Sequence, residues 1–96
     1  MKIILKPHLK IRLEGRQIPL NYPNKILSKP DNQYFDTATK HMIAVRKLEY
    51  KEKVRPMVVA YDIIENGTEV VTIYPSNEQE INNRIKNKRW IKYEKS

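Results

Sequence analysis

The sequence predicts an α+β domain in which helices pack on one face of a mostly antiparallel sheet. Two observations carry this prediction. The chain reads as a strand, two helical segments, three strands and a final helix, and its last two strands flank Asn66-Gly67, the strongest short-range signal for a hairpin. Ninety-six residues form one domain, residues 1–96, with a small core.

The first third of the chain is expected to hold a short strand and two helices. Residues 2–5 are mostly apolar and partly β-branched, which favours a strand. Pro7 suits the first turn of a helix, whose leucines then repeat every four residues up to Gly15, a typical C-terminal stop. A second, weaker helical segment over residues 24–28 lies between two prolines.

The middle of the chain is rich in Val, Ile and Tyr and predicts a three-stranded meander. Its strands are expected over residues 41–50, 55–64 and 68–75. Ser76 and Gln79 have the spacing of a capping box, so a helix is expected to start at Ser76. The closing segment WIKYE is expected to be extended and could add an edge strand.

The hairpin predicts which side chains share a face of the sheet. If Asn66 and Gly67 are the two turn residues, the register places Tyr61 opposite Thr72 and close to Tyr74. The other face is then small and apolar, suited to receive helices. Phenols on the first face could cover the core, stack on bases or donate hydrogen bonds.

The net charge of +8 is concentrated at the two ends of the chain. Residues 1–16 hold five basic side chains and one acidic, residues 84–96 hold six and one, and the segment between them holds eight and nine. If the ends meet in space, the fold has one strongly basic surface, as nucleic-acid-binding proteins do. The alternative is that lysine is simply abundant and solubilising.

Composition excludes several other classes of function. The absence of cysteine excludes disulfides, thiol catalysis and thiolate metal sites, and fits a cytoplasmic protein. Two histidines argue against a conventional histidine metal site, and no cofactor is expected. No apolar run is long enough to span a bilayer, and the apolar run near the N-terminus is too short for a signal peptide, so no membrane partner is expected.

A row of cationic side chains is predicted on the first helix. His8, Arg12 and Arg16 are four residues apart, a spacing that stacks side chains on one helix face. The row either faces solvent or faces a polyanion. Arg46 lies among apolar neighbours in a strand, which is unusual unless it faces water or a ligand. His41, at the start of that strand, is interpreted as an ordinary surface residue.

Several segments, in order, resemble a family of small domains of unknown function. In PHLKIRLEGRQI, the residues His8, Arg12, Arg16 and Ile18 fit the opening of these domains, whereas Gln17 replaces the usual Gly. KILSKPDNQYFD resembles their next segment, and VVTIYP followed by NRIKNKRW resembles their closing strand and helix. The similarity covers nearly the whole chain.

Such domains are similar to the RelE-type and BrnT-type toxins of prokaryotic toxin–antitoxin pairs. The resemblance implies a RelE-like fold in the order β-α-α-β-β-β-α. It also implies an endonuclease activity on free or ribosome-bound mRNA, held in check by a cognate antitoxin.

The residues can be matched to metal-independent RNA cleavage. The 2′-hydroxyl of RNA acts as nucleophile, and the enzyme supplies a base, an acid and cations against the charge on the phosphate. His8 is the expected proton-transfer group, and guanidiniums match phosphate in bidentate fashion. The expected catalytic set is His8, Arg12, Arg46, Tyr61, Tyr74 and Arg84, and the expected nucleic-acid contacts are Arg16, Lys88, Arg89 and Trp90, with Trp90 equally suited to anchor the core.

Two other classes of function remain open. The chain could be an RNA- or ribosome-binding domain without catalysis, because the charge distribution supports this equally well. It could also be a degenerate toxin that acts only as a protein-interaction module. The oligomeric state does not follow from the sequence.

Overall fold

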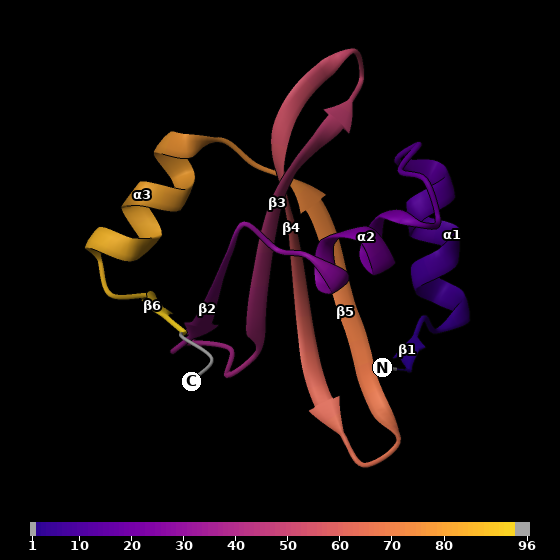
Figure 1. Ribbon diagram of the computed structural model, residues 1–96, viewed down its shortest axis with the longest axis horizontal. Helices are drawn as coiled ribbons and strands as arrows, with labels where there is room; N and C mark the ends of the chain where they lie inside the picture. Colours follow the sequence, from indigo (N-terminus) through magenta and orange to yellow (C-terminus); the bar gives the residue numbers. More distant parts are fainter. Residues whose placement is uncertain (1, 94–96) are drawn as a thin grey trace.

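The computed structural model describes residues 2–93 and shows a sheet with helices on both sides (Figure 1). The elements are β1 (Ile3–Ile4), α1 (Pro7–Gly15), α2 (Tyr22–Ser28), β2 (Asn32–Asp36), β3 (Met42–Tyr50), β4 (Lys53–Ile64), β5 (Gly67–Pro75), α3 (Glu78–Lys86) and β6 (Trp90–Lys92). In this part of the chain, no helix is long and apolar enough to cross a membrane.

The sheet has six strands in the order β1-β5-β4-β3-β2-β6. All neighbouring strands are antiparallel except β1 and β5, which pair in parallel. The predicted α+β class with a mostly antiparallel sheet is therefore confirmed. The predicted order of elements is incomplete, because β2 is an additional strand between α2 and β3, and the closing segment does add the edge strand β6. Residue 94 of that segment lies outside the described residues.

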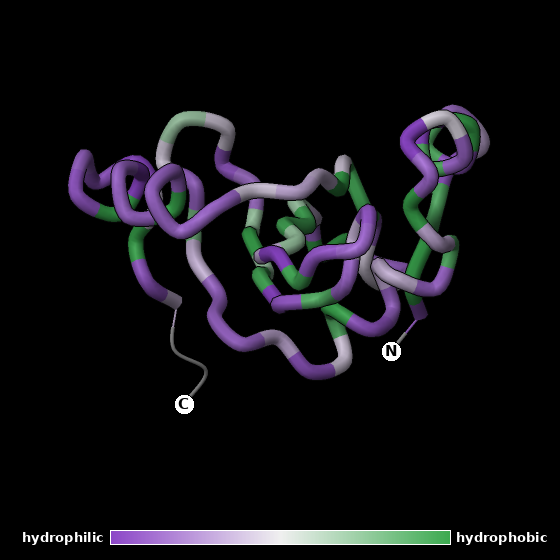
Figure 2. The backbone as a smooth tube through the Cα atoms, turned by 90° about the horizontal axis from the view of Figure 1, so that it is seen from above, coloured by the Kyte–Doolittle hydropathy of each residue, from purple (hydrophilic) through white to green (hydrophobic). Residues whose placement is uncertain are grey.

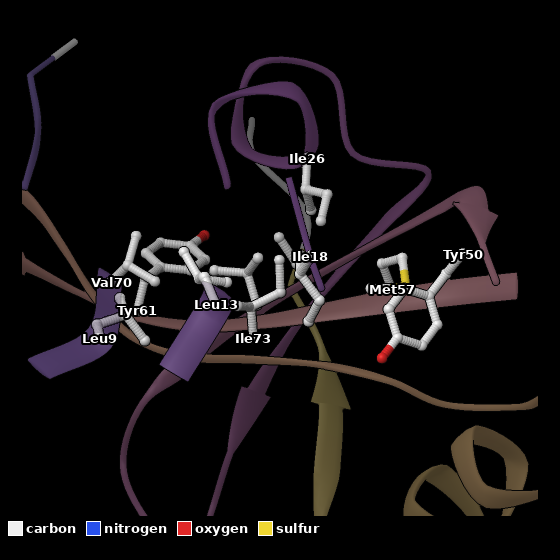
Figure 3. Close-up of a cluster of buried hydrophobic side chains, with 11 residues drawn as sticks. Leu9, Leu13, Ile18, Ile26, Tyr50, Met57, Tyr61, Val70 and Ile73 are labelled. Carbon is white, nitrogen blue, oxygen red and sulfur yellow. The ribbon is translucent and has the colours of Figure 1, made fainter. Parts of the chain in front are cut away.

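The prediction that helices cover one face only is wrong. α1 and α2 cover one face of the sheet, where Leu9, Leu13 and Ile26 pack on Val59 and Ile73 (Figure 3). We call this the α1–α2 face.

The opposite face, which we call the α3 face, has a core of its own. It is built from Ile81 of α3, Trp90 and side chains of the central strands, among them Ile43, Val45 and Val58. Two cores arise because β3 and β4 are apolar at successive positions, and successive side chains of a strand point to opposite faces. In the view from above, hydrophobic segments gather at the centre, whereas most of α3 is hydrophilic (Figure 2).

The register of the β4–β5 hairpin differs from the predicted one. Glu65 and Asn66 form the turn and Gly67 already pairs with Ile64 in the ladder. Tyr61 consequently faces Val70, and the register shifts between Ala60 and Tyr61. Gly67 is needed in the strand because it has a φ of 144° and lies against the backbone of Lys2, where a Cβ would be 2.4 Å from the carbonyl oxygen.

The hairpin register separates the two tyrosines that were predicted to share a face. Tyr61 is buried in the core of the α1–α2 face. Tyr74 pairs with Val58 and packs against the core of the α3 face. The prediction of a common tyrosine surface with Thr72 is therefore wrong, and its physical cause is the β-bulge beside Tyr61.

The helix boundaries follow local signals. Pro7 opens α1 and Gly15 is its last residue, as expected, and α2 contains the predicted segment 24–28. α3 starts at Glu78, because the side chain of Asn77 accepts a hydrogen bond of 2.8 Å from the backbone N–H of Glu80. The predicted N-cap, Ser76, is wrong by one residue, because Asn77 is the N-cap. The Ser76 hydroxyl donates a hydrogen bond to the Glu80 carboxylate and not to a backbone N–H group of the helix.

Candidate nucleic-acid interface

The two basic ends of the chain do not meet. The Cα trace measures 36 × 32 × 22 Å, and α1 and α3 lie at opposite ends of its longest axis in both views (Figures 1 and 2). The condition for a single basic surface, that the two ends meet, is therefore not met within residues 2–93. The protein has two separate basic regions, one on α1 and one around α3 and β6, and only part of the expected site lies on each.

Of the predicted cationic row on α1, Arg16 is hydrogen-bonded to the sheet, whereas His8 and Arg12 project into solvent. His8 and Arg12 are exposed, and Arg12 lies in the last turn, where the helix dipole favours a cation. Arg16 donates through Nη1 to the carbonyl of Ile73 at 3.0 Å. The carbonyl of Arg16 accepts a 2.7 Å hydrogen bond from the hydroxyl of Tyr50. Arg16 therefore fastens the end of α1 to the sheet.

Arg46 has a structural partner as well. Its Nη1 donates to the carbonyl of Lys25 at 2.9 Å, so the guanidinium docks α2 onto β3. This contact accounts for a strand arginine among apolar neighbours. The same carbonyl also accepts hydrogen bonds from the Ser28 hydroxyl at 3.1 Å and from the N–H of Lys29 at 3.4 Å, within the last turn of α2.

Tyr61 is a core residue on the α1–α2 face. Its side chain is buried, and its hydroxyl donates to Oε1 of Gln33 at 3.3 Å. Burial raises the pKa of Tyr61, and the neighbouring Tyr93 adds to the rise. Both tyrosines line a pocket of about 130 Å³ together with Leu27 and Met42. That volume is too small for a nucleotide, so the geometry does not place Tyr61 in an RNA site.

On the α3 face, the buried carboxylate of Asp36 organises the surrounding side chains. Oδ1 accepts from the backbone N–H groups of Ala38 and Thr39 at 2.9 and 3.1 Å and from Nε of Arg89 at 2.9 Å. Oδ2 accepts from Nε1 of Trp90 at 3.2 Å. Burial by itself would raise the pKa of Asp36, but these hydrogen bonds outweigh it and hold the pKa well below its usual range.

The backbone after α3 aims Arg89 at this carboxylate. Lys88 has a φ of 59°, and the N–H of Arg89 donates to the carbonyl of Arg84 at 2.9 Å, the pattern of a left-handed helix stop. The carbonyls of Lys88 and Arg89 in turn accept from the hydroxyl of Thr37 at 3.2 and 3.1 Å. The side chain of Lys88 is exposed.

Trp90 anchors the core rather than a base. Its exposed fraction is 2%, and its ring stacks on Tyr34 with centroids 5.4 Å apart. Of the two roles open from the sequence, its burial in the described structure matches that of a core anchor. The guanidinium of Arg84 lies 5.4 Å from the centre of the Trp90 ring, a cation–π contact that holds Arg84 over the buried side chain.

Tyr74 lies on the same face, within electrostatic range of both arginines. Burial raises its pKa, Arg84 and Arg89 act in the opposite direction, and Asp36 and Glu80 add to the rise. Because the pKa of Tyr74 is raised, the phenol keeps its proton at neutral pH and is able to donate a hydrogen bond.

The structure therefore brings together Tyr74, Arg84, Lys88 and Arg89, and separates them from the α1 residues. Sequence reasoning missed Asp36, the residue that holds this group together. Its signal was present in the segment Asp36-Thr37-Ala38-Thr39, because an aspartate at such a position often binds backbone N–H groups of the following turn.

Sequence reasoning also missed the partner of His41. Nδ1 of this imidazole lies 2.7 Å from Oδ1 of Asp62 on the next strand. The two residues are 21 positions apart, so only the register of β3 and β4 shows the pair.

Comparison with protein-family models, with curated proteins and with solved structures gives no match for this chain.

Proposed function

We propose that the protein binds RNA on the α3 face and cleaves it without a metal ion, as a RelE-like toxin controlled by an antitoxin. The observation that carries the proposal is a cluster on the α3 face, in which Arg89 binds the Asp36 carboxylate, Arg84 lies over the Trp90 ring and Tyr74 packs against the same core. The elements from β1 to α3 follow the order β-α-α-β-β-β-β-α, which differs from the order expected for a RelE-like fold by one added strand. RNA as substrate would place the activity in the cytoplasm.

The arrangement suits a phosphodiester. Two guanidiniums are fixed by contacts on their inner side, Arg89 by a carboxylate and Arg84 by an aromatic ring, and both remain partly exposed. Guanidinium binds phosphate in bidentate fashion, and a donor that is already held in place loses little side-chain entropy on binding. The exposed Lys88 precedes Arg89 in the chain and adds a further positive charge to this surface.

The chemistry at this face would be stabilisation of the negative charge that develops on the non-bridging oxygens of the phosphate. The 2′-hydroxyl attacks the adjacent phosphate, and the protonated Tyr74 phenol donates a hydrogen bond to a non-bridging oxygen while the arginines neutralise its charge. Removing one hydrogen-bond donor of this kind typically lowers the reaction rate by a factor of about 10²–10³.

The expected catalytic set is revised accordingly. The proposal retains Tyr74 and Arg84 as the groups that act on the phosphate, with Arg89 and Lys88 as further RNA contacts. It does not use His8, Arg12, Arg46 or Tyr61, which belong to α1 and the α1–α2 face.

The test is cleavage of structured and single-stranded RNA by the purified protein in the presence of EDTA. Tyr74→Phe removes only the hydroxyl and should lower the cleavage rate by about 100-fold or more. Arg84→Ala should also lower RNA affinity and reduce the slope of log affinity against log salt by about 0.7, the value for one phosphate contact on a single strand. Lys10→Ala, an exposed cation on α1, is the control and should change neither quantity. Equal cleavage by wild type and both α3-face variants would refute the proposal.

An RNA-binding domain without catalysis is the second candidate. It is favoured by the separation of α1, and with it the imidazole of His8, from the α3 face. This candidate predicts RNA affinity that depends on Arg84 and on salt but no cleavage of any RNA by the wild type. Growth arrest on expression, relieved by co-expression of a neighbouring gene, would favour the toxin.

A further inference from the structure

The α3 face carries a histidine–carboxylate pair at one end. Nδ1 of His41 lies 2.7 Å from Oδ1 of Asp62, and the two side chains are 30% and 38% exposed. A hydrogen bond at Nδ1 leaves Nε2 as the nitrogen available to another molecule. Both side chains are partly exposed, so the pair lies at the surface of the sheet and not in its core.

The strand register places the pair on the α3 face. Met42 pairs with Tyr61, so His41 and Asp62 face one another one position further along β3 and β4. Met42 and Tyr61 belong to the α1–α2 face, and successive side chains alternate. His41 therefore shares its face with Ile43, which lies in the core of the α3 face.

The pair is one strand away from the arginine site. The backbone N–H of Asp36 donates to the carbonyl of His41 at 2.9 Å, so these two residues face each other across β2 and β3. Facing residues on neighbouring strands have Cβ atoms about 4.5–5.5 Å apart. The carboxylate of Asp36 holds Arg89 at 2.9 Å. Imidazole, carboxylate and guanidinium therefore lie in one row across the end of the sheet.

The charged groups around the imidazole are of both signs. Asp62 faces it from β4 and Asp36 from β2, with Arg89 bound to Asp36. Glu69 on β5 is opposite Asp62 and is paired with Lys6 at 3.2 Å.

We infer that His41, oriented by Asp62, is the proton acceptor for the 2′-hydroxyl in the RNA cleavage assigned to this face. The inference rests on the proposed function and supplies the base that it lacks. A carboxylate at Nδ1 selects the tautomer whose Nε2 carries a lone pair, and it stabilises the imidazolium that forms when Nε2 takes a proton.

The step balances in atoms and charge. Nε2 of His41 takes the proton of the 2′-hydroxyl, O2′ forms a bond to phosphorus, and the bond from phosphorus to O5′ breaks. Water gives a proton to O5′, and the imidazolium returns its proton to solvent. The products are a 2′,3′-cyclic phosphate and a 5′-hydroxyl end.

The test compares variants of the full chain in the same cleavage assay, with RNA affinity measured in parallel. His41→Ala should lower the cleavage rate about 100-fold or more with RNA affinity changed less than threefold, because general-base catalysis contributes about 10²–10⁴. Added imidazole should restore at least tenfold of the lost rate, which a purely structural histidine would not allow. Asp62→Asn should slow cleavage about tenfold or more, whereas Glu65→Gln, an exposed acid-to-amide change in the β4–β5 turn, should not.

Each result decides between the hypotheses. Thermal unfolding of His41→Ala verifies that the variant folds, and Asp62→Asn tests the same pair without removing the ring. Cleavage by His41→Ala within threefold of wild type overturns the inference and leaves the proposed function standing. Loss of cleavage in His8→Ala together with full activity in His41→Ala would show that the proton acceptor is His8 on α1. A wild type that binds RNA but cleaves none refutes both proposals.

Discussion

Asp36→Asn is the substitution for which the structure allows the most detailed stability prediction. The change keeps the shape of the side chain but removes its charge and replaces one acceptor oxygen by an NH₂ group. In the native protein, four hydrogen bonds end on this carboxylate, three on Oδ1 and one on Oδ2. The side chain of Asp36 is 6% exposed, so water cannot replace the lost partners.

The expected loss can be built from these contacts. In the better of the two amide orientations, the oxygen keeps the two backbone N–H groups and Arg89, and the NH₂ group faces Nε1 of Trp90. That buried indole N–H is then without an acceptor, which costs about 1–3 kcal/mol. The bond to Arg89 also loses its charge assistance, an effect that solvent around the 39% exposed guanidinium keeps small. The free energy of unfolding should fall by roughly 1–3 kcal/mol, the cost of the buried indole N–H.

Urea denaturation followed by circular dichroism measures this difference. Asp31→Asn is the matched control, because Asp31 is exposed and its carboxylate accepts one backbone hydrogen bond, from Lys47 at 2.9 Å. The control should lose about 1 kcal/mol or less. An Asp36→Asn protein as stable as the Asp31→Asn protein would refute the claim that this buried carboxylate organises the α3 face.

Three further predictions concern the fold. Because the pKa of Asp36 is lowered in the native state, the unfolded chain binds more protons than the native state below about pH 4. The free energy of unfolding should therefore fall as the pH is lowered through that range. The urea midpoint of Asp36→Asn should depend less steeply on pH than the urea midpoint of the wild type. Gly67→Ala should lower the free energy of unfolding by about 1–3 kcal/mol in the same assay, because Gly67 has a φ of 144° and an added Cβ would lie 2.4 Å from the carbonyl oxygen of Lys2. Gly15→Ala is the control: an added Cβ there has no atom within 4 Å, so the change should be neutral or stabilise the protein by up to about 1 kcal/mol. Equal losses in the two variants would contradict this reasoning. Leu13→Ala should cost about 2–5 kcal/mol, since Leu13 is 1% exposed, and a loss below 1 kcal/mol would show that α1 is not packed as described.

Local signals in the sequence predicted most elements because their causes are local. A proline that opens a helix, a leucine repeat and a run of β-branched residues act within a few positions of the chain, so α1 and the central strands were found close to their observed bounds. The strand β2 was missed because it has only five residues beside Pro30, and its pairing with β3 and β6 stabilises it more than its own composition.

Side-chain positions across the sheet depended on a single residue of register. Placing the turn at Asn66-Gly67 rather than Glu65-Asn66 shifts the pairing by two positions, which leaves every side chain on its predicted face. The β-bulge between Ala60 and Tyr61 adds one residue to β5, and this extra residue puts Tyr74 on the face opposite to Tyr61. One unpaired residue therefore changes the whole site.

The sequence by itself determined the class of fold, the excess of cations and the residues able to contact phosphate. Tertiary structure decided which of those residues meet. Arg16 and Arg46 bind backbone carbonyls and hold α1 and α2 on the sheet. Arg84 lies over Trp90, Arg89 binds Asp36, and His41 is hydrogen-bonded to Asp62. Composition and local pattern act along the chain, whereas a site depends on distances between strands and helices that only the packed sheet sets.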